Sequence, residues 1–365
     1  MRSLAALVLG AACVGLAQTP LQSPEVHSDK TVTFRLDAPK ATDVTVSGEW
    51  NLNKPQALSK DSKGIWTITV GPIPPNIYIY TFSVDGLTVT DPINPSVKLR
   101  ARTSASMVHI PGDQPWDFRD VPHGAVEINW HRSAVLDGAA RQIFVYTPPE
   151  YYKSRSARYP VLYLLHGNND LAAGWTFAGN ANLILDNFQA EKKAVPMIIV
   201  MPWGHAAPFG SPGNNERFEQ YFLKEVMPLM EAKYRVSPGR RNRAIVGLSM
   251  GGGHALQIGL GHLDLFASVG LYGASMSKAD FEGRHKTLIA DAAGTNKKLD
   301  LFWIGIGNQD GGAARAKQFS ETLRANGIEH KYHETDGGHT YPVWRKLLVE
   351  TAPLLFRKGA SPHSD

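Results

Sequence analysis

The chain has 365 residues, of which 43% are hydrophobic, and 38 Lys and Arg residues against 33 Asp and Glu residues give a net charge of +5. This length exceeds that of one average domain, so we expect two domains and a large buried core. The basic residues come in short pairs, such as Lys192-Lys193, and never in a long block. The charge pattern therefore does not favour a nucleic-acid-binding protein.

Residues 1–17 have the pattern of a secretion signal. Arg2 supplies a positive start, an apolar run extends from Leu4 to Leu16, and small Ala17 precedes the expected cleavage. The run is too short to span a bilayer comfortably. Alternatives are an N-terminal core helix and lipoprotein processing at Cys13, the only cysteine. We predict a secreted or periplasmic protein that lacks disulfides and membrane association once the signal is removed.

The first part of the chain reads as an all-β domain. Residues 18–29 are polar and are expected to form a flexible lead-in. Short apolar runs then alternate with Gly, Pro, Asn and Asp at 31–36, 44–46, 65–70 and 77–84. Strands at this spacing predict a small β-sandwich over residues 30–100. Residues 101–123 are predicted to form a linker.

From residue 124 to residue 358, apolar strands alternate with helical patterns, and 359–365 are expected to be a disordered tail. Continuous apolar runs at 161–165 and 196–201 predict strands that are buried on both faces. This alternation predicts an α/β domain with a mostly parallel sheet and helices on both faces. Functional residues should then lie at the carboxyl ends of the strands.

A serine lies in the pattern G-x-S-x-G, formed by Gly247, Ser249 and Gly251. The pattern follows a β-branched strand and precedes a predicted helix, the context of a nucleophile elbow. A serine hydroxyl needs a base to remove its proton and a turn that exposes it. The alternative is a glycine-rich loop with an incidental serine, but the flanking strand and helix favour a nucleophile.

The nucleophile-elbow fold predicts the chain order serine, acid, histidine. Asp310 follows a predicted strand that ends at Ile306, and His339 follows the last predicted strand after two glycines. Asp336 is a rival acid, but it is too close to His339 in the chain for the usual arrangement. We predict a catalytic triad of Ser249, Asp310 and His339.

Two backbone N–H groups should form the oxyanion hole. Met250 directly follows the nucleophile, and Asn168 lies in the loop after the buried 161–165 strand. An alternative for this loop is that His166 binds a metal, but no second ligand at a suitable spacing accompanies it. We therefore predict no metal and no cofactor.

Several segments together resemble the α/β-hydrolases of carbohydrate esterase family one, the esterase D type. They are "YLLHGNND", "PMIIVMPWGH", "NRAIVGLSMGGGHAL", "GIGNQD" and "DGGHTYPVWR". This family includes feruloyl and acetylxylan esterases, and siderophore esterases and mycolyltransferases are related to it. The resemblance implies the same triad and a carboxylic-ester hydrolase that acts on acyl esters of plant cell-wall polysaccharide or on small aromatic esters. "HGNND" is less glycine-rich than the corresponding loop in most of the family.

The first domain is similar to the immunoglobulin-like carbohydrate-binding module that precedes glycogen-branching enzymes. The segments that carry this likeness are "VTFRLDAPKATDVTVSGEWN", "KGIWTITVGPI" and "YIYTFSVDGLTVTDPINP". Some of these modules bind glucan through exposed aromatic rings, and others serve only in packing. Trp50 and Trp66 are the candidates for sugar contact here, with core packing as the alternative.

Four aromatic residues follow strand-end motifs and are predicted to line an acyl pocket, with the core as the alternative for each: Trp175, Trp203, Phe209 and Tyr341. Such a pocket favours feruloyl esterase activity. Alternatives are an acetylxylan esterase, a siderophore esterase, an acyltransferase and a non-catalytic carbohydrate-binding protein.

Overall fold

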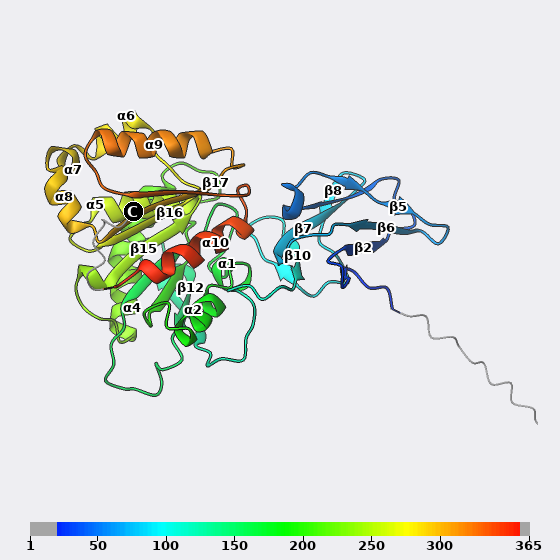
Figure 1. Cartoon of the computed structure of the whole chain (residues 1–365), viewed down its shortest axis with the longest axis horizontal. Coiled ribbons are helices and arrows are strands. Elements are labelled where there is room, and N and C mark those ends of the chain that lie inside the picture. The colour runs from blue at the N-terminus through cyan, green and yellow to red at the C-terminus, as the bar shows by residue number, and fades with distance from the viewer. Residues whose placement is uncertain (1–19, 358–365) are drawn as a thin grey trace, which may run out of the picture.

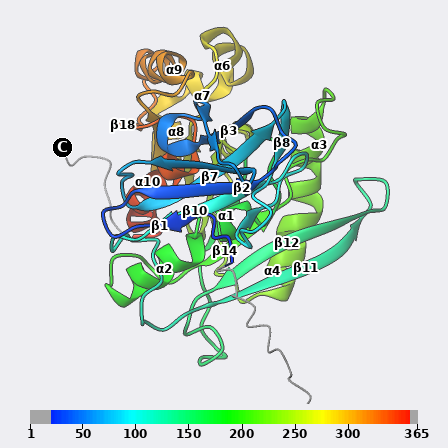
Figure 2. The same cartoon turned by 90° about the vertical axis from the view of Figure 1, so that its right-hand side faces the viewer.

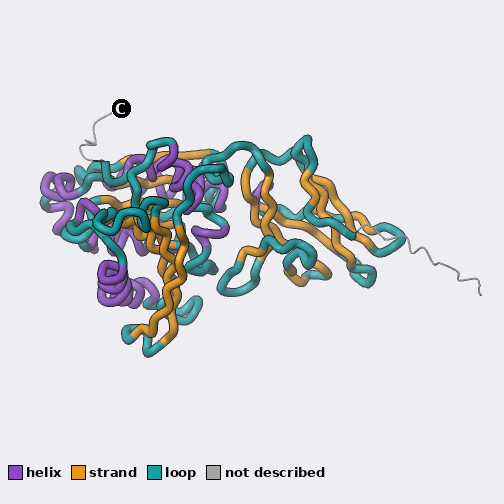
Figure 3. Tube along the Cα trace, turned by 90° about the horizontal axis from the view of Figure 1, so that it is seen from below, coloured by secondary structure: helices purple, strands orange, loops and turns teal. Residues whose placement is uncertain are grey.

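The computed structural model describes residues 20–357, so the predicted signal (1–17, with Ala17) and tail (359–365) lie outside the described residues. An all-β region and an α/β region lie side by side (Figure 1). Strands and loops make up the first, whereas the helices gather in the second (Figure 3). No helix within residues 20–357 has the length and apolar character needed to cross a membrane.

The first region contains two antiparallel sheets around one apolar core. The smaller sheet has the strand order β1 (Glu25–Val26), β2 (Val32–Asp37), β6 (Ile65–Val70), β5 (Ser59–Lys60). The larger has the order β4 (Gln56–Ala57), β3 (Val44–Gly48), β7 (Asn76–Val84), β10 (Ala105–Ile110), β9 (Val97–Lys98), with β8 (Leu87–Val89) on β7 and a 3-10 turn (Glu49–Asn51) after β3. Alternate residues of β3 point inward, which places Val44 and Val46 in this core.

Two boundaries differ from the sequence prediction. The expected lead-in contains β1, which pairs with β2 through Glu25 and Val26. The expected linker contains β10, which pairs with β7 from Ser106 to Ile110. β1 has only two residues and pairs locally with the next strand, whereas β10 is stabilised by pairing with the distant strand β7.

The α/β region is built on an eight-stranded mixed sheet. Its order is β11 (Ala125–Ser133), β12 (Ala139–Thr147), β14 (Ile198–Pro202), β13 (Val161–Leu165), β15 (Arg243–Leu248), β16 (Ser268–Tyr272), β17 (Leu301–Gly307), β18 (Lys331–Thr335). The strands from β14 to β18 run parallel, whereas β11 and β12 join antiparallel as a hairpin at one edge (Figure 2). Because both sheets of the first region are antiparallel, strand pairing over the whole described chain is mostly antiparallel.

Helices cover both faces of this sheet. One apolar cluster packs beneath α3 (Asn214–Tyr221), a π-helical turn (Phe222–Val226), α4 (Met227–Lys233), α5 (Met250–Gly261) and α9 (Ala313–Ala325). The other packs beneath α1 (Gly174–Phe177), α2 (Ala181–Ala190) and α10 (Tyr341–Thr351). The remaining helices are short: α6 (Lys278–Arg284), α7 (Lys286–Ala290), α8 (Ala292–Lys298) and 3-10 turns at Arg240–Asn242 and Ala352–Leu354.

Candidate active site

Ser249 occupies a strained turn between β15 and α5. Its backbone has φ 51° and ψ −117°, which is unfavourable for a residue with a side chain. A Cβ at Gly247 would lie 2.1 Å from the carbonyl oxygen of Gly251, and one at Gly251 would lie 2.5 Å from that of His166. Only glycine fits at these two positions, so the spacing of the motif follows from the turn.

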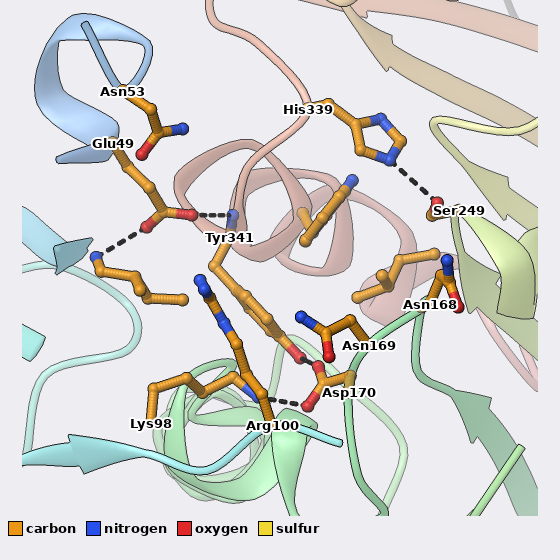
Figure 4. Close-up of a pocket in the computed structure, with 14 residues that line it drawn as sticks. Glu49, Asn53, Lys98, Arg100, Asn168, Asn169, Asp170, Ser249, His339 and Tyr341 are labelled. Atoms are coloured by element: carbon orange, nitrogen blue, oxygen red, sulfur yellow. Dashed lines mark hydrogen bonds and ion pairs between the residues drawn. The ribbon is translucent and has the colours of Figure 1, made fainter. Parts of the chain in front are cut away.

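The three residues of the predicted triad lie in one hydrogen-bonded row. Nε2 of His339 is 2.9 Å from Oγ of Ser249, and Nδ1 of His339 is 2.5 Å from Oδ2 of Asp310 (Figure 4 shows the first contact). Ser249 follows β15, Asp310 follows β17 and His339 follows β18, so all three lie at the carboxyl edge of the parallel sheet. This geometry lets the serine hydroxyl donate to His339 while the imidazole Nδ1–H donates to the carboxylate.

The carboxylate of Asp310 is held in its charged form. Its side chain is only 6% exposed, and burial by itself would raise its pKa. Hydrogen bonds from His339 and from the Gly312 N–H outweigh burial, and the pKa of Asp310 lies below its ordinary value. A charged Asp310 can orient His339 and stabilise the imidazolium that forms when the ring accepts a proton.

The two predicted oxyanion donors lie beside the nucleophile. Met250 is the first residue of α5, so its N–H has no acceptor within its own helix. Asn168 lines the same cavity as Ser249, and the loop that carries it approaches so closely that a Cβ at Gly167 would lie 3.2 Å from Cβ of Ser249. The arrangement therefore brings two backbone segments to the point where an oxyanion would form.

His166 has partners on both ring nitrogens, which accounts for it without a metal. The Gly204 N–H donates to Nε2 at 2.8 Å, so the proton resides on Nδ1, which lies 2.8 Å from the Gly167 carbonyl oxygen. Burial lowers the pKa of His166 and keeps the ring neutral. No group of three His, Cys, Asp or Glu side chains suited to a metal occurs within residues 20–357.

A cavity of about 400 Å³ opens beside Ser249 and His339, and the first region forms its opposite wall. The first region contributes Glu49, Asn53, Ile79, Lys98 and Arg100 to its lining, and Figure 4 labels four of these across the cavity from Ser249 and His339. None of these five residues was predicted from the sequence to line the site. They are scattered between positions 49 and 100 of a separate domain, and only the packing of the two regions brings them to the cavity.

The four predicted pocket aromatics have different environments. Tyr341 lines the cavity of Ser249, whereas Trp203 and Phe209 line a neighbouring cavity of about 390 Å³. Trp175 is fully buried, and its Nε1–H donates to the Leu165 carbonyl oxygen at 3.0 Å. Trp175 therefore belongs to the core because its indole satisfies a buried carbonyl group there. Sequence reasoning missed Trp344, which lines the cavity of Ser249.

The two candidate sugar-contacting tryptophans pack in the first region. Trp50 stacks on Phe34 with ring centroids 5.2 Å apart, and its Nε1–H donates to Gln56. Trp66 is 7% exposed, and its Nε1–H donates to the Ala38 carbonyl oxygen. Both rings therefore contribute to the domain core.

The fold and the site define an α/β-hydrolase of the esterase type. The family described as "Putative esterase" matches residues 133–355, and the chain belongs to this family. The prediction of an esterase is thus confirmed at the level of the family.

Comparison with known proteins adds related esterases. An endo-1,4-β-xylanase/feruloyl esterase of Xylanibacter ruminicola is 30% identical over 349 residues, which cover 92% of this chain and 46% of the relative. An esterase of Mycobacterium tuberculosis is 27% identical over 239 residues, 53% of this chain and 51% of the relative. The chain thus spans about half the length of the curated relatives that it matches.

Among solved structures, a CE1 ferulic acid esterase of Anaeromyces mucronatus is 25% identical with a TM-score of 0.57, over 67% of this chain and 96% of that one. An enterobactin esterase of Shigella flexneri has a TM-score of 0.66 over 88% of this chain and 92% of that one. At 17% identity the second likeness concerns the fold alone. It covers enough of the chain to include both regions.

Proposed function

We propose that this protein is a serine carboxylic-ester hydrolase that releases ferulate-type acids from esters of plant cell-wall polysaccharide. The row of hydrogen bonds from Ser249 through His339 to Asp310 is the observation that carries the proposal. The feruloyl esterases among the similar proteins support the choice of substrate.

In the proposed reaction, Oγ of Ser249 attacks the ester carbonyl carbon while Nε2 of His339 takes its proton. The negative charge on the carbonyl oxygen is stabilised by the N–H groups of Met250 and Asn168. The C–O bond to the alcohol then breaks, and His339 donates its proton to the departing oxygen. Water then attacks the acyl carbon while His339 takes one of its protons; the bond from that carbon to Oγ of Ser249 breaks, the acid leaves, and His339 returns the proton to Oγ. Asp310 keeps the imidazole in the productive tautomer throughout.

The proposal includes the compartment and the first region. Residues 1–17 support secretion, which would bring the protein to polysaccharide outside the cell. Two antiparallel sheets around one core support an immunoglobulin-like module of the carbohydrate-binding type. The second candidate substrate is a siderophore ester, because the likeness to the enterobactin esterase extends over both regions.

The test is hydrolysis of methyl ferulate, acetylated xylan and a tricatecholate ester by the purified protein, with Ser249→Ala alongside. We expect ferulate release, and a kcat at least about 10³-fold lower in the variant because the nucleophile is absent. Ser59→Ala removes an exposed serine of β5 and serves as the matched control. A Ser249→Ala protein with the wild-type rate would overturn the serine mechanism.

The same assay selects among substrates. Release of acetate without ferulate would move the function to acetylxylan esterase. Faster hydrolysis of the tricatecholate ester than of methyl ferulate would favour the siderophore candidate.

A further inference from the structure

The first region is fixed to the α/β region by a shared buried interface. Ile77, Ile79 and Met107 belong to the same apolar cluster as residues of α2 and α10. Arg345 of α10 is fully buried, and its guanidinium donates to Oδ1 of Asn76 at 2.7 Å and to the Ile77 carbonyl oxygen. Residues of the first region therefore keep a defined position relative to Ser249.

The segment 98–102 is attached to the loop that carries Asn168. Lys98 forms a buried ion pair with Asp170. The N–H groups of Ala101 and Arg102 donate to the backbone oxygen and to Oδ1 of Asn169, at 3.1 and 3.0 Å. Arg100 lies between these attachment points, so its backbone is held beside the oxyanion loop.

Arg100 is a half-buried cation with free hydrogen-bonding capacity. Its side chain lines the cavity of Ser249 and His339 (Figure 4). The other two charged side chains of this wall have partners, since Lys98 pairs with Asp170 and Glu49 accepts the N–H groups of Ile79 and Tyr341. Within residues 20–357, the Arg100 guanidinium forms neither a direct ion pair nor a hydrogen bond, although its charge acts on the nearby Glu49 carboxylate and offsets part of the burial that raises the pKa of Glu49.

A ligand that enters this side of the cavity must offer oxygen acceptors. An apolar ring would displace water from the guanidinium without replacing its hydrogen bonds, which is unfavourable. Asn53, on the same wall, adds an amide that can both donate and accept. A sugar meets this requirement with hydroxyl and ring oxygens on all sides, whereas the aryl part of a ferulate carries only one hydroxyl and one methoxy oxygen at the far edge of an apolar ring.

We propose that Arg100, assisted by Asn53, forms a subsite for the sugar part of the ester, supplied to the active site by the first region. This assignment rests on the proposed function. It places the sugar part of the ester against the wall that the first region forms. The first region then contributes to substrate selection within the catalytic cavity itself.

The experiment compares kcat/KM for a ferulate ester of arabinose with kcat/KM for methyl ferulate, which lacks the sugar. Arg100→Met removes the donors and keeps an unbranched side chain. We expect it to lower the ratio of the two kcat/KM values about tenfold or more, the effect of a lost charged hydrogen bond. Arg100→Lys keeps one charged donor group, so its ratio should lie between those of the wild type and Arg100→Met. Asn53→Ala should lower the ratio less than Arg100→Met does. The matched control is Arg132→Met, an exposed arginine of β11, with an unchanged ratio.

Two results would overturn the subsite. Wild-type values of kcat/KM on both substrates in Arg100→Met would mean that Arg100 does not contact the sugar. Equal losses on both substrates would mean that it acts through the fold.

A binding titration separates this proposal from the proposed function. Ser249→Ala, which cannot form the acyl-enzyme, is titrated with the feruloyl arabinose ester, with and without Arg100→Met. A Kd raised about tenfold by Arg100→Met supports the subsite even if the wild-type protein hydrolyses neither ester. Absence of binding, or binding that is indifferent to Arg100, overturns the subsite whatever the hydrolysis assay shows.

Discussion

The two regions of this molecule contribute to the active site in different ways. The α/β region places Ser249, Asp310 and His339 on loops at the carboxyl edge of one parallel sheet. The first region supplies no member of this row, yet it forms the opposite wall of the cavity. The parallel sheet alone therefore brings the three residues of the proposed triad together, whereas the rest of the cavity depends on how the first region packs against the α/β region.

The polar side chains of the two regions are also held differently. His339 is 43% exposed, so solvent and substrate can reach it. At the interface, Lys98 and Arg345 are buried, and each contacts groups of the other region. A buried charge is tolerated only when it is paired and hydrogen-bonded, so each of these contacts should be costly to break.

The largest expected effect is on the α/β side, in Asp310→Asn. The amide no longer stabilises the imidazolium or selects the tautomer of His339, so we expect kcat on methyl ferulate to fall about 10³- to 10⁴-fold. Steady-state kinetics would measure it. Asp336→Asn is the matched control, because Asp336 bonds to Asn308 and not to His339. If kcat fell more in Asp336→Asn than in Asp310→Asn, the triad acid would be Asp336 and not Asp310.

The residues of this row were accessible to sequence reasoning because each follows a local pattern. A strand, a turn and a helix surround Ser249, and Asp310 and His339 each follow an apolar strand in the order that the fold requires. The same reasoning failed for Trp175, because a strand-end position does not reveal that an indole N–H satisfies a buried carbonyl group.

The wall residues had no comparable local signal. Lys98 lies between Val97 and Leu99 at the end of the short strand β9, and its burial depends on Asp170, 72 positions later. Glu49 follows β3 in a short turn, and its acceptor role depends on Tyr341, 292 positions later. Contacts of this kind follow from the packing of two domains, which local hydrophobic patterns do not determine.

The interface itself can be broken with Arg345→Met. The substitution removes the arginine donor of the buried Ile77 and Ala178 carbonyl oxygens, and it leaves Oδ1 of Asn76 with the Ile77 N–H alone. We expect the free energy of unfolding to fall by about 3–5 kcal/mol, measured by urea denaturation. Arg132→Met, at the exposed hairpin, should change it by less than about 0.5 kcal/mol. Equal stability of the two variants would show that the regions are only loosely joined.

Lys98→Met breaks the ion pair beside the oxyanion loop and should destabilise the protein by about 3 kcal/mol at neutral pH. Burial raises the pKa of Asp170, but Lys98 and other partners outweigh it, so the native pKa lies below the ordinary value of 3.8. In the wild type, the contribution of the Asp170 carboxylate to the free energy of unfolding is thus fully present above pH 3.8. It is lost as the pH falls through the native pKa of Asp170.

In Lys98→Met the buried carboxylate loses its cation, and its native pKa rises. The stability difference from the wild type should therefore be largest at neutral pH and shrink as the pH falls toward 3.8 and below. Urea denaturation between pH 3 and pH 7 measures this difference, with exposed Lys63→Met as the control. A difference that does not vary with pH would mean that Asp170 does not depend on Lys98 for its charge.

The smallest expected effect tests whether the first region also positions the triad. Glu49 accepts the N–H groups of Ile79 at 2.8 Å and of Tyr341 at 3.0 Å, and Tyr341 follows His339 by two residues. In Glu49→Gln one of these donors faces an amide NH₂ group, so the loop that carries His339 should shift. We expect a kcat about tenfold lower, with KM changed less than about twofold, because a misplaced base slows the reaction more than it weakens binding.

The split between the two constants decides the role of Glu49. A raised KM with an unchanged kcat would make Glu49 a substrate contact of the cavity wall and would contradict a positioning role. Glu25→Gln, which removes a surface ion pair with Arg35 in the same region, should leave both constants unchanged. A lower kcat in Glu49→Gln, with no change in Glu25→Gln, would mean that the first region helps to set the geometry of the proposed triad in the α/β region.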